Sequence, residues 1–316
     1  MKALITGITG FAGSHLAEAL LAAGDQVLGI SRQQQWPTTL PTELASAIPL
    51  LQWDISEPVT PELQEAIAKW QPDGCYHLAA ISIPADCGTT TPTSTALACN
   101  VAGTQHLVEL LTSLPQTPRL LLTSSNHVYA PVTASAPLVS EEAVVKPASA
   151  YGKTKLAAEA IVLQAVHNQQ LQACIARSFQ HTGPRQAARL MVPEWACQFA
   201  QEATTVRVHT LNSYLDISDV RDVVQAYQAL MRQKTNETVF NVGSGTNTRS
   251  GDVCELFQQR VNERRQIKEM APGQRQHPIA DISKLQKATG WQPVIKLEQT
   301  IDDTLNYWKE QTTATG

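Results

Sequence analysis

The chain has 316 residues, 43% of them hydrophobic and 16% charged, with a formal net charge of −4. This composition is typical of a folded globular protein and excludes the disordered and fibrous classes. Because Lys and Arg form no cluster and no apolar run approaches the ~20 residues of a membrane span, the sequence predicts no nucleic-acid or membrane partner.

The N-terminus, MKALITG, enters a strand pattern at once and shows no signal-peptide cleavage pattern. Six cysteines, at positions 75, 87, 99, 174, 197 and 254, have no paired spacing such as CxxC. We interpret them as reduced core residues, since free cysteine is among the most buried residue types. The sequence therefore predicts a soluble, cytoplasmic protein with no metal site.

Short apolar runs alternate with helix-length segments through the first 180 residues. The expected strands are 3–6, 26–30, 49–53, 75–79, 119–123 and 173–177, and the expected helices include 11–23, 60–70, 97–114 and 150–170. Strands without polar alternation are typical of a sheet covered on both faces. This rhythm predicts βαβ units and a doubly wound parallel sheet in the α/β class.

The second part of the chain has a different character. Several prolines separate short helices and loops there, and only VFNVG (239–243) resembles another buried strand. We expect a dinucleotide-binding domain over residues 1–178 and a smaller α/β substrate lobe over 179–316, with strand 239–243 returning to the main sheet.

The first expected strand ends in TGITGFAGSHL, which places Gly7, Gly10 and Gly13 before a helix. Glycines permit a tight turn and let backbone N–H groups approach a pyrophosphate, while the helix N-terminus adds partial positive charge. The position of this GxxGxxG between a strand and a helix gives it weight. It predicts that Gly7, Gly10, Phe11 and Ala12 contact a dinucleotide.

The end of the second strand lacks a carboxylate. An acid there bonds the ribose 2′-hydroxyl of NAD, whereas an arginine accommodates the 2′-phosphate of NADP. Ser31 and Arg32 occupy this place, and no acid follows before Glu43. The pair predicts that NADP(H) is preferred and NAD(H) possible, unless Arg32 is an ordinary exposed arginine. Asp54, after the third strand, is an expected adenine contact or else a solvated strand-end acid.

A candidate catalytic set follows the fifth strand, in TSSNHVY (123–129) and YGKTK (151–155). Tyr151 and Lys155 share one helix face because they are four residues apart. A tyrosine can protonate a carbonyl oxygen as hydride reaches the carbon if a nearby ammonium lowers its pKa. We therefore expect Tyr151 and Lys155 to be catalytic, with the Ser125 hydroxyl holding the same oxygen.

With these motifs the chain resembles the extended short-chain dehydrogenase/reductases, the group of nucleotide-sugar epimerases, dehydratases and reductases, over nearly its whole length. The matching stretches are TGITGFAGSHL, HLAA (77–80), Asn100 with AGT (102–104), SSNHVY, YGKTK, DVRDVV (219–224), NVGSG (241–245) and ADISKLQKATGWQP (280–293). The resemblance implies a Rossmann domain and a homodimer in which helices 97–114 and 150–170 pair as a four-helix bundle.

The resemblance also implies site residues. Further cofactor contacts, besides Tyr151 and Lys155, would be Ile55, Leu78, Ala79, Ala80, Asn100, Thr123, Ser178 and, near the nicotinamide, Phe179. Substrate contacts would be Ser125, Asn126, Gln180, Arg185, Val192, Arg221 and Arg275. Gln180 replaces the usual Asn, and Leu215 replaces an arginine that commonly meets the diphosphate; Arg185, Arg189, Arg221 and Arg275 are candidates for the missing charge.

Within the family, dehydratases place an acid pair where this chain has Asn126 and His127, so we expect no dehydratase and interpret His127 as a structural hydrogen-bonding residue. The stretches 176–186 and 190–201 resemble those of GDP-4-dehydro-6-deoxy-mannose reductases. We expect NADPH-dependent reduction of a 4-keto-6-deoxy sugar nucleotide, GDP-linked by preference, giving a product such as GDP-rhamnose. The alternatives are an NAD-retaining 4-epimerase and a non-catalytic NADP-sensing protein.

Overall fold

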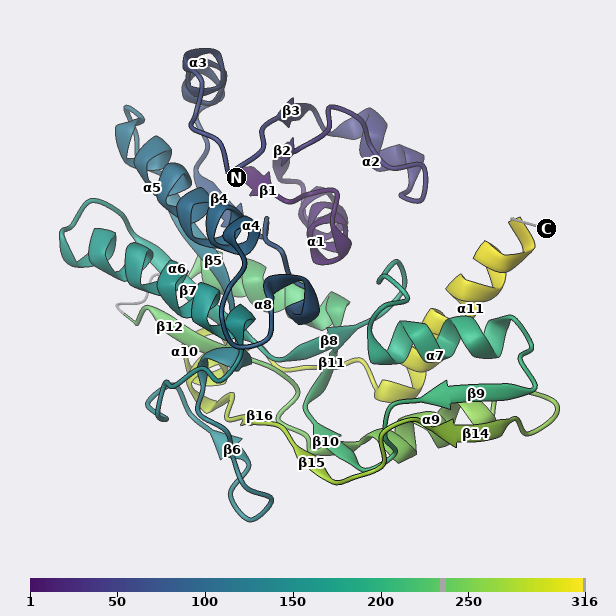
Figure 1. The fold of residues 1–316 in the computed structure, drawn as a ribbon. Helices are drawn as coiled ribbons and strands as arrows, with labels where there is room; N and C mark the ends of the chain where they lie inside the picture. The colour runs from purple at the N-terminus through teal and green to yellow at the C-terminus, as the bar shows by residue number, and fades with distance from the viewer. Residues whose placement is uncertain (234–236, 315–316) are drawn as a thin grey trace.

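The structure, a computed structural model, describes residues 1–233 and 237–314 (Figure 1). Its centre is a seven-stranded parallel sheet in the order β12-β7-β5-β4-β1-β2-β3. The strands are β1 (Lys2–Thr6), β2 (Gln26–Ser31), β3 (Leu50–Gln52), β4 (Gly74–His77), β5 (Arg119–Ser125), β7 (Ala173–Ser178) and β12 (Val239–Val242). The predicted α/β class with a doubly wound parallel sheet is confirmed.

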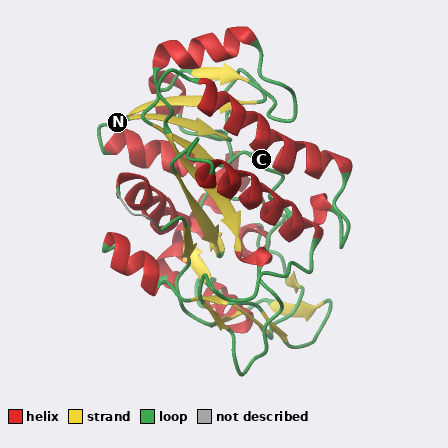
Figure 2. Cartoon of the chain, turned by 90° about the vertical axis from the view of Figure 1, so that its left-hand side faces the viewer, coloured by secondary structure: helices red, strands yellow, loops and turns green. Residues whose placement is uncertain are grey.

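Helices cover both faces of this sheet (Figure 2). On one face pack α1 (Phe11–Ala22), α2 (Thr42–Ala47), α8 (Val220–Arg232) and α10 (Ser283–Thr289). On the other pack α3 (Pro61–Trp70), α5 (Gly103–Ser113) and α6 (Ala150–His167). Successive strand residues therefore enter different cores: Ile5 joins the first and Leu4 the second. Double burial explains why the strands read as unbroken apolar runs.

Strand order reverses between β1 and β4, because the chain proceeds outward through β2 and β3 and then returns to the other side of β1. The carboxyl ends of β1 and β4 consequently flank a crevice, which is where open α/β sheets bind ligands. The glycine turn after β1 and the segment after β4 both lie at this switch point.

The helix expected at 97–114 is longer and interrupted. It begins as α4 (Ser94–Leu97), passes through a π-helical turn, η2 (Ala98–Ala102), and continues as α5. Thr93 caps its start by accepting a hydrogen bond from the Ala96 N–H at 3.1 Å. Single π turns within α-helices are frequent at functional sites, and this one carries Asn100.

The smaller lobe has a core of its own, in which Trp195, Phe199 and Phe257 are among the buried side chains. Its helices are α7 (Met191–Ala200), α9 (Ser250–Gln258) and α11 (Leu297–Ala314). Its strands are β8 (Gln180–Thr182), β9 (Thr205–Val208), β10 (Ser213–Leu215), β11 (Ile217–Asp219), β13 (Thr248–Arg249), β14 (Gln266–Glu269) and β15 (Arg275–Gln276). A further pair, β6 (Leu138–Val139) and β16 (Ile279–Ala280), joins the two halves of the chain.

The second half of the chain adds the one expected strand to the central sheet and also supplies helices that cover it. Strand β12 pairs in parallel with β7, and helices α8 and α10 also pack into the core that contains α1. Only part of 179–316 therefore forms the lobe. A helix pattern in the sequence shows that a face is buried, but not against which core.

Among the described residues, no helix is both long and apolar enough to cross a membrane. In the same part of the chain, no group of three or more His, Cys, Asp or Glu side chains is arranged to hold a metal ion. All six cysteines are free thiols, and four of them are buried.

Candidate active site

A cavity of about 320 Å³ lies over the carboxyl ends of the central strands. Its floor is the turn after β1, where Gly7 has a φ of 72° and a Cβ would lie 2.6 Å from the Ala79 backbone nitrogen. A Cβ on Gly13 would lie 2.2 Å from the Gly7 carbonyl oxygen. Both positions therefore require glycine. At Gly7 the turn packs against the segment that follows β4, and at Gly13 the helix α1 packs against the turn itself.

The first turn of α1 is suited to an anion. Gly10 is its N-cap and gives no side-chain cap, and the first turn carries no acidic residue. The leading N–H groups of a helix have no partner within the helix, and their dipoles favour negative charge. Together with the glycine turn, this geometry fits the pyrophosphate of a dinucleotide.

Most of the expected cofactor residues line this cavity. They are Gly7, Gly10, Phe11, Ala12, Ser31, Arg32, Asp54, Ile55, Leu78, Ala79, Ala80, Thr123, Tyr151, Lys155 and Ser178. Asn100 and Phe179 do not. Asn100 is buried and binds the backbone of Ile81 at both its N–H and its carbonyl, and it donates to the Thr154 hydroxyl at 3.0 Å. It therefore connects the segment after β4 to α6 from behind the cavity.

At the end of β2, the Ser31 hydroxyl lies 3.0 Å from the Thr9 hydroxyl, and Arg32 is exposed. The nearby Asp54 uses one carboxylate oxygen to accept hydrogen bonds from the Ser56 N–H and hydroxyl, at 3.0 and 2.7 Å. These bonds, with a smaller contribution from Arg32, hold the pKa of Asp54 below its usual value. At this edge the cavity thus offers an exposed cation, Arg32, beside a carboxylate that is already hydrogen-bonded.

The three expected catalytic residues converge where β5 meets α6. Ser149 caps α6 by accepting from the Gly152 N–H at 3.1 Å, which places Tyr151 and Lys155 in the first turns. The Lys155 ammonium donates to the Thr123 carbonyl at 2.9 Å and lies 5.9 Å from the centre of the Tyr151 ring. Ser125 ends β5 and lines the neighbouring cavity together with Tyr151.

Burial has the largest effect on the pKa of both Tyr151 and Lys155. It lowers the pKa of Lys155 to about 8. It raises the pKa of Tyr151, and a hydrogen bond with Ser125 acts in the opposite direction. The expectation that Lys155 lowers the pKa of Tyr151 is therefore not met in this structure, where burial raises that pKa and favours the neutral phenol.

A second cavity of about 470 Å³ adjoins the first and shares Tyr151, Ser124 and Ser178 with it. Four expected substrate residues line it: Ser125, Asn126, Gln180 and Val192. The side-chain oxygen of Gln180 is buried and has no hydrogen-bond partner within the described structure. Phe179 lines this cavity instead of the first one. A carbonyl compound bound here would face Tyr151 and Ser125.

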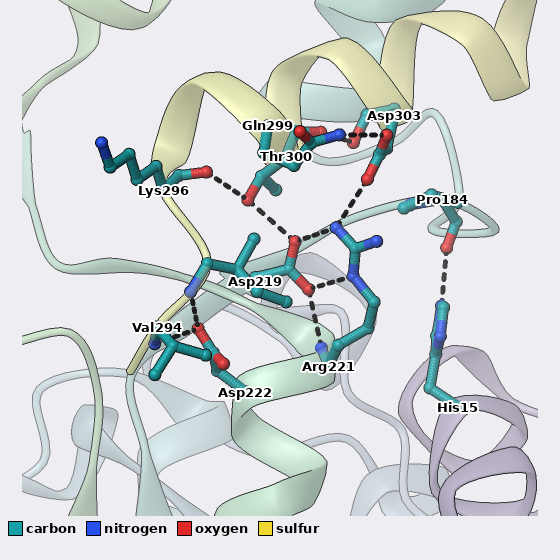
Figure 3. A network of polar contacts seen from close by, with 12 residues as sticks. His15, Pro184, Asp219, Arg221, Asp222, Val294, Lys296, Gln299, Thr300 and Asp303 are labelled. Atoms are coloured by element: carbon teal, nitrogen blue, oxygen red, sulfur yellow. Dashed lines mark hydrogen bonds and ion pairs between the residues drawn. The ribbon is translucent and has the colours of Figure 1, made fainter. Parts of the chain in front are cut away.

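Three expected substrate residues do not line either cavity. Arg185 binds both carboxylate oxygens of Glu18, at 2.6 and 2.9 Å, and contacts His15 on α1. Arg221 binds Asp219 and Asp303, each at 2.7 Å (Figure 3). Arg275 is exposed on β15. Arg185 and Arg221 are thus paired with carboxylates of α1, β11 and α11 and line neither cavity in this structure.

Sequence reasoning missed part of both cavities. His181 was not predicted. Its ring stacks on that of Phe11, an expected cofactor contact, with ring centres 5.9 Å apart, and both residues line the two cavities. Ser82 does the same, while Pro84 lines the second cavity only. The position of Ser82, two residues after HLAA (77–80), was an available signal, because residues that follow a strand at the switch point line the crevice.

The fold, the glycine turn and the Ser125, Tyr151 and Lys155 set define an extended short-chain dehydrogenase/reductase. A family model described as GDP-mannose 4,6 dehydratase matches residues 4–304. The chain belongs to this family of nucleotide-sugar-modifying enzymes.

Individual relatives span several reactions. The GDP-6-deoxy-D-mannose reductase of Pseudomonas aeruginosa is 28% identical over 319 residues, with 98% of each chain covered. A solved structure of RMD from Pseudomonas aeruginosa complexed with NADPH has a TM-score of 0.82 at 25% identity, covering 98% of this chain and 99% of that one. UDP-glucuronic acid 4-epimerase from Bacillus cereus, in complex with UDP-glucuronic acid and NAD, has a TM-score of 0.83 at 24% identity, covering 98% and 100%.

Proposed function

We propose that this protein is an NADPH-dependent reductase of a 4-keto-6-deoxy sugar nucleotide, with GDP-4-dehydro-6-deoxy-D-mannose as the favoured substrate and GDP-D-rhamnose as the product. The observation that carries the proposal is the pair Ser31 and Arg32 at the edge of the dinucleotide cavity, where NAD-specific proteins have an acid. Similarity to the Pseudomonas aeruginosa reductase supports it.

The mechanism follows from the positions of the side chains. A bound nicotinamide cofactor supplies hydride to the carbonyl carbon. Tyr151 donates its proton to the carbonyl oxygen, and Ser125 orients that oxygen by a hydrogen bond. Lys155, held by the Thr123 carbonyl, presents positive charge beside the phenolate that forms. Asn126 cannot serve as the acid that water elimination requires, which separates this site from a dehydratase.

The direct test is an assay of purified protein with NADPH and a 4-keto-6-deoxy sugar nucleotide. We expect the absorbance of reduced nicotinamide to fall and a 6-deoxyhexose nucleotide to form. GDP- and dTDP-linked substrates assayed in parallel measure the base preference. If the absorbance of NADPH does not fall with any keto sugar nucleotide tested, the result would instead favour the alternative of a non-catalytic NADP-sensing protein.

A 4-epimerase is the second candidate, since the fold and the Ser, Tyr and Lys set also serve oxidation followed by re-reduction of one sugar carbon. The structural similarity to the Bacillus cereus 4-epimerase supports this second candidate. An epimerase need not release its cofactor. Cofactor extracted from freshly purified protein and identified by mass spectrometry distinguishes the two, because tightly retained NAD would indicate the epimerase.

Cofactor preference has its own test in the Arg32→Ala variant. A charge-assisted hydrogen bond contributes about 1.5–3 kcal/mol, so we expect the KM for NADPH to rise roughly tenfold to a hundredfold. The KM for NADH should change little, because NADH has no 2′-phosphate. Gln33→Ala, the neighbouring exposed position, is the matched control. Equal losses for both cofactors would contradict the proposed role of Arg32.

We also propose a homodimer. Each protomer would contribute two helices, the interrupted helix that runs from α4 to α5 and the helix α6, to a four-helix bundle. Two large apolar side chains on these helices, Leu97 on α4 and Leu163 on α6, are 45% and 38% exposed. Covering them against a second copy would remove apolar area from water. Sedimentation analysis tests this, and a monomer at micromolar concentration would contradict it.

A further inference from the structure

The second cavity, lined by Ser125, Asn126, Gln180 and Val192, is the one that would hold the substrate, and we call it the substrate cavity. It is lined by no charged side chain of the described residues: none is Lys, Arg, Asp or Glu. Its two histidines, His127 and His181, are held mainly neutral, because burial lowers the pKa of each, to about 4 for His127. The diphosphate of a nucleotide sugar is anionic, so an uncharged cavity requires a cation at its edge to bind such a substrate strongly.

Two of the four candidate arginines are already committed elsewhere. Arg221 holds Asp219, which is 3% exposed, and Arg185 is itself largely buried against Glu18. Moving Arg221 to a ligand would leave a buried carboxylate without its partner, which is strongly unfavourable. Neither arginine is therefore free to exchange partners when substrate binds.

Arg189 is in a different situation. It lies between Ala187 and Leu190, both of which line the cavity, and its side chain is 59% exposed. Its guanidinium binds both carboxylate oxygens of Asp86, at 2.7 and 3.0 Å. Asp86 belongs to the 3-10 turn η1 (Pro84–Cys87), which begins at another residue of the cavity lining, Pro84. The ion pair therefore joins two cavity-lining segments, one from each half of the chain, at the edge of the site.

We propose that Arg189 binds the diphosphate of the substrate, exchanging the Asp86 carboxylate for phosphate oxygens, and so replaces the arginine absent at Leu215. An exposed ion pair contributes little to stability because water screens it, so the exchange costs little. The guanidinium already presents the two-pronged geometry that phosphate oxygens accept. The inference rests on the proposed nucleotide-sugar function and adds to it the residue that recognises the anionic part.

The test measures GDP and guanosine binding by calorimetry, with the protein saturated with NADPH so that the dinucleotide cavity is filled. For Arg189→Ala we expect the Kd for GDP to rise roughly tenfold to a hundredfold, with guanosine binding unchanged. For Asp86→Asn we expect GDP to bind as tightly as to wild type or severalfold more tightly, because Arg189 loses its competitor. Arg264→Ala removes a comparably exposed pair, with Glu255, in which neither residue lines a cavity described above, and it should change neither Kd.

The different responses of the two partners, a loss of GDP affinity for Arg189→Ala and no loss for Asp86→Asn, distinguish this proposal from a structural tether. If the pair only joins the two segments, Arg189→Ala and Asp86→Asn should weaken GDP binding equally, and that result would overturn the proposal. Loss of GDP affinity in Arg275→Ala but not in Arg189→Ala would also overturn it. If wild-type protein binds GDP no more tightly than guanosine, the result contradicts the proposed nucleotide-sugar function itself, independently of the results for the Arg189 variant.

Discussion

The Tyr151→Phe variant is expected to lose activity by roughly 10²–10⁴-fold, the usual contribution of a positioned general acid. The substitution removes one oxygen atom and keeps the ring, which packs beside His127 with ring centres 5.4 Å apart. The carbonyl oxygen of the substrate would then develop negative charge with no proton donor at hand. The measurement is kcat for NADPH oxidation with the keto sugar nucleotide.

The control for this experiment is Tyr76→Phe. Tyr76 is fully buried in the core of the sheet, and its hydroxyl has no hydrogen-bond partner among the described residues, so its removal leaves nothing unsatisfied. We expect this variant to keep its activity and stability. NADPH affinity should be nearly unchanged in both variants. A Tyr151→Phe enzyme that retained more than about a tenth of the wild-type rate would exclude Tyr151 as the proton donor.

The sequence predicted the central sheet well because its strands are buried on both faces and its turns depend on glycine. Gly7 is an example, since its left-handed φ and its contact with Ala79 allow no other residue. The YxxxK spacing likewise predicted that Tyr151 and Lys155 lie on one helix, because residues four apart along a helix share a face. In both cases the physical requirement is local, and therefore visible along the chain.

What the sequence could not predict depends on long-range partners. Arg185 and Glu18 are 167 residues apart, yet their ion pair decides that this arginine is unavailable to substrate. Asn100 matched a family motif, but its hydrogen bonds are to Ile81 and Thr154, behind the cavity. Charge and motif identify candidates, whereas burial and pairing determine which candidate is free to bind a ligand.

The Arg177→Met variant should lower the free energy of unfolding by about 3–5 kcal/mol, because it leaves a buried carboxylate without its partner. Arg177, on β7, binds Glu159 of α6 at 2.7 Å, and the two side chains are only 7% and 1% exposed. Glu159 also accepts a hydrogen bond from Ser124, the residue before Ser125. The ion pair therefore connects α6 to β7, and the Ser124 hydrogen bond connects the same carboxylate to β5, the strand that ends in Ser125. Denaturant unfolding measures the change.

The double variant Arg177→Met/Glu159→Leu distinguishes the loss of a pair from the loss of packing. Removing both charges leaves no unpaired ion, so the double variant should be more stable than Arg177→Met alone. Arg264→Met, which breaks an exposed pair with Glu255, should alter stability little. If Arg177→Met unfolds like wild type, the buried ion pair does not stabilise the attachment of α6 to the sheet at β7. In that event the register of Ser125 against Tyr151 must depend on the Ser149 cap and on the packing of α6 against the sheet.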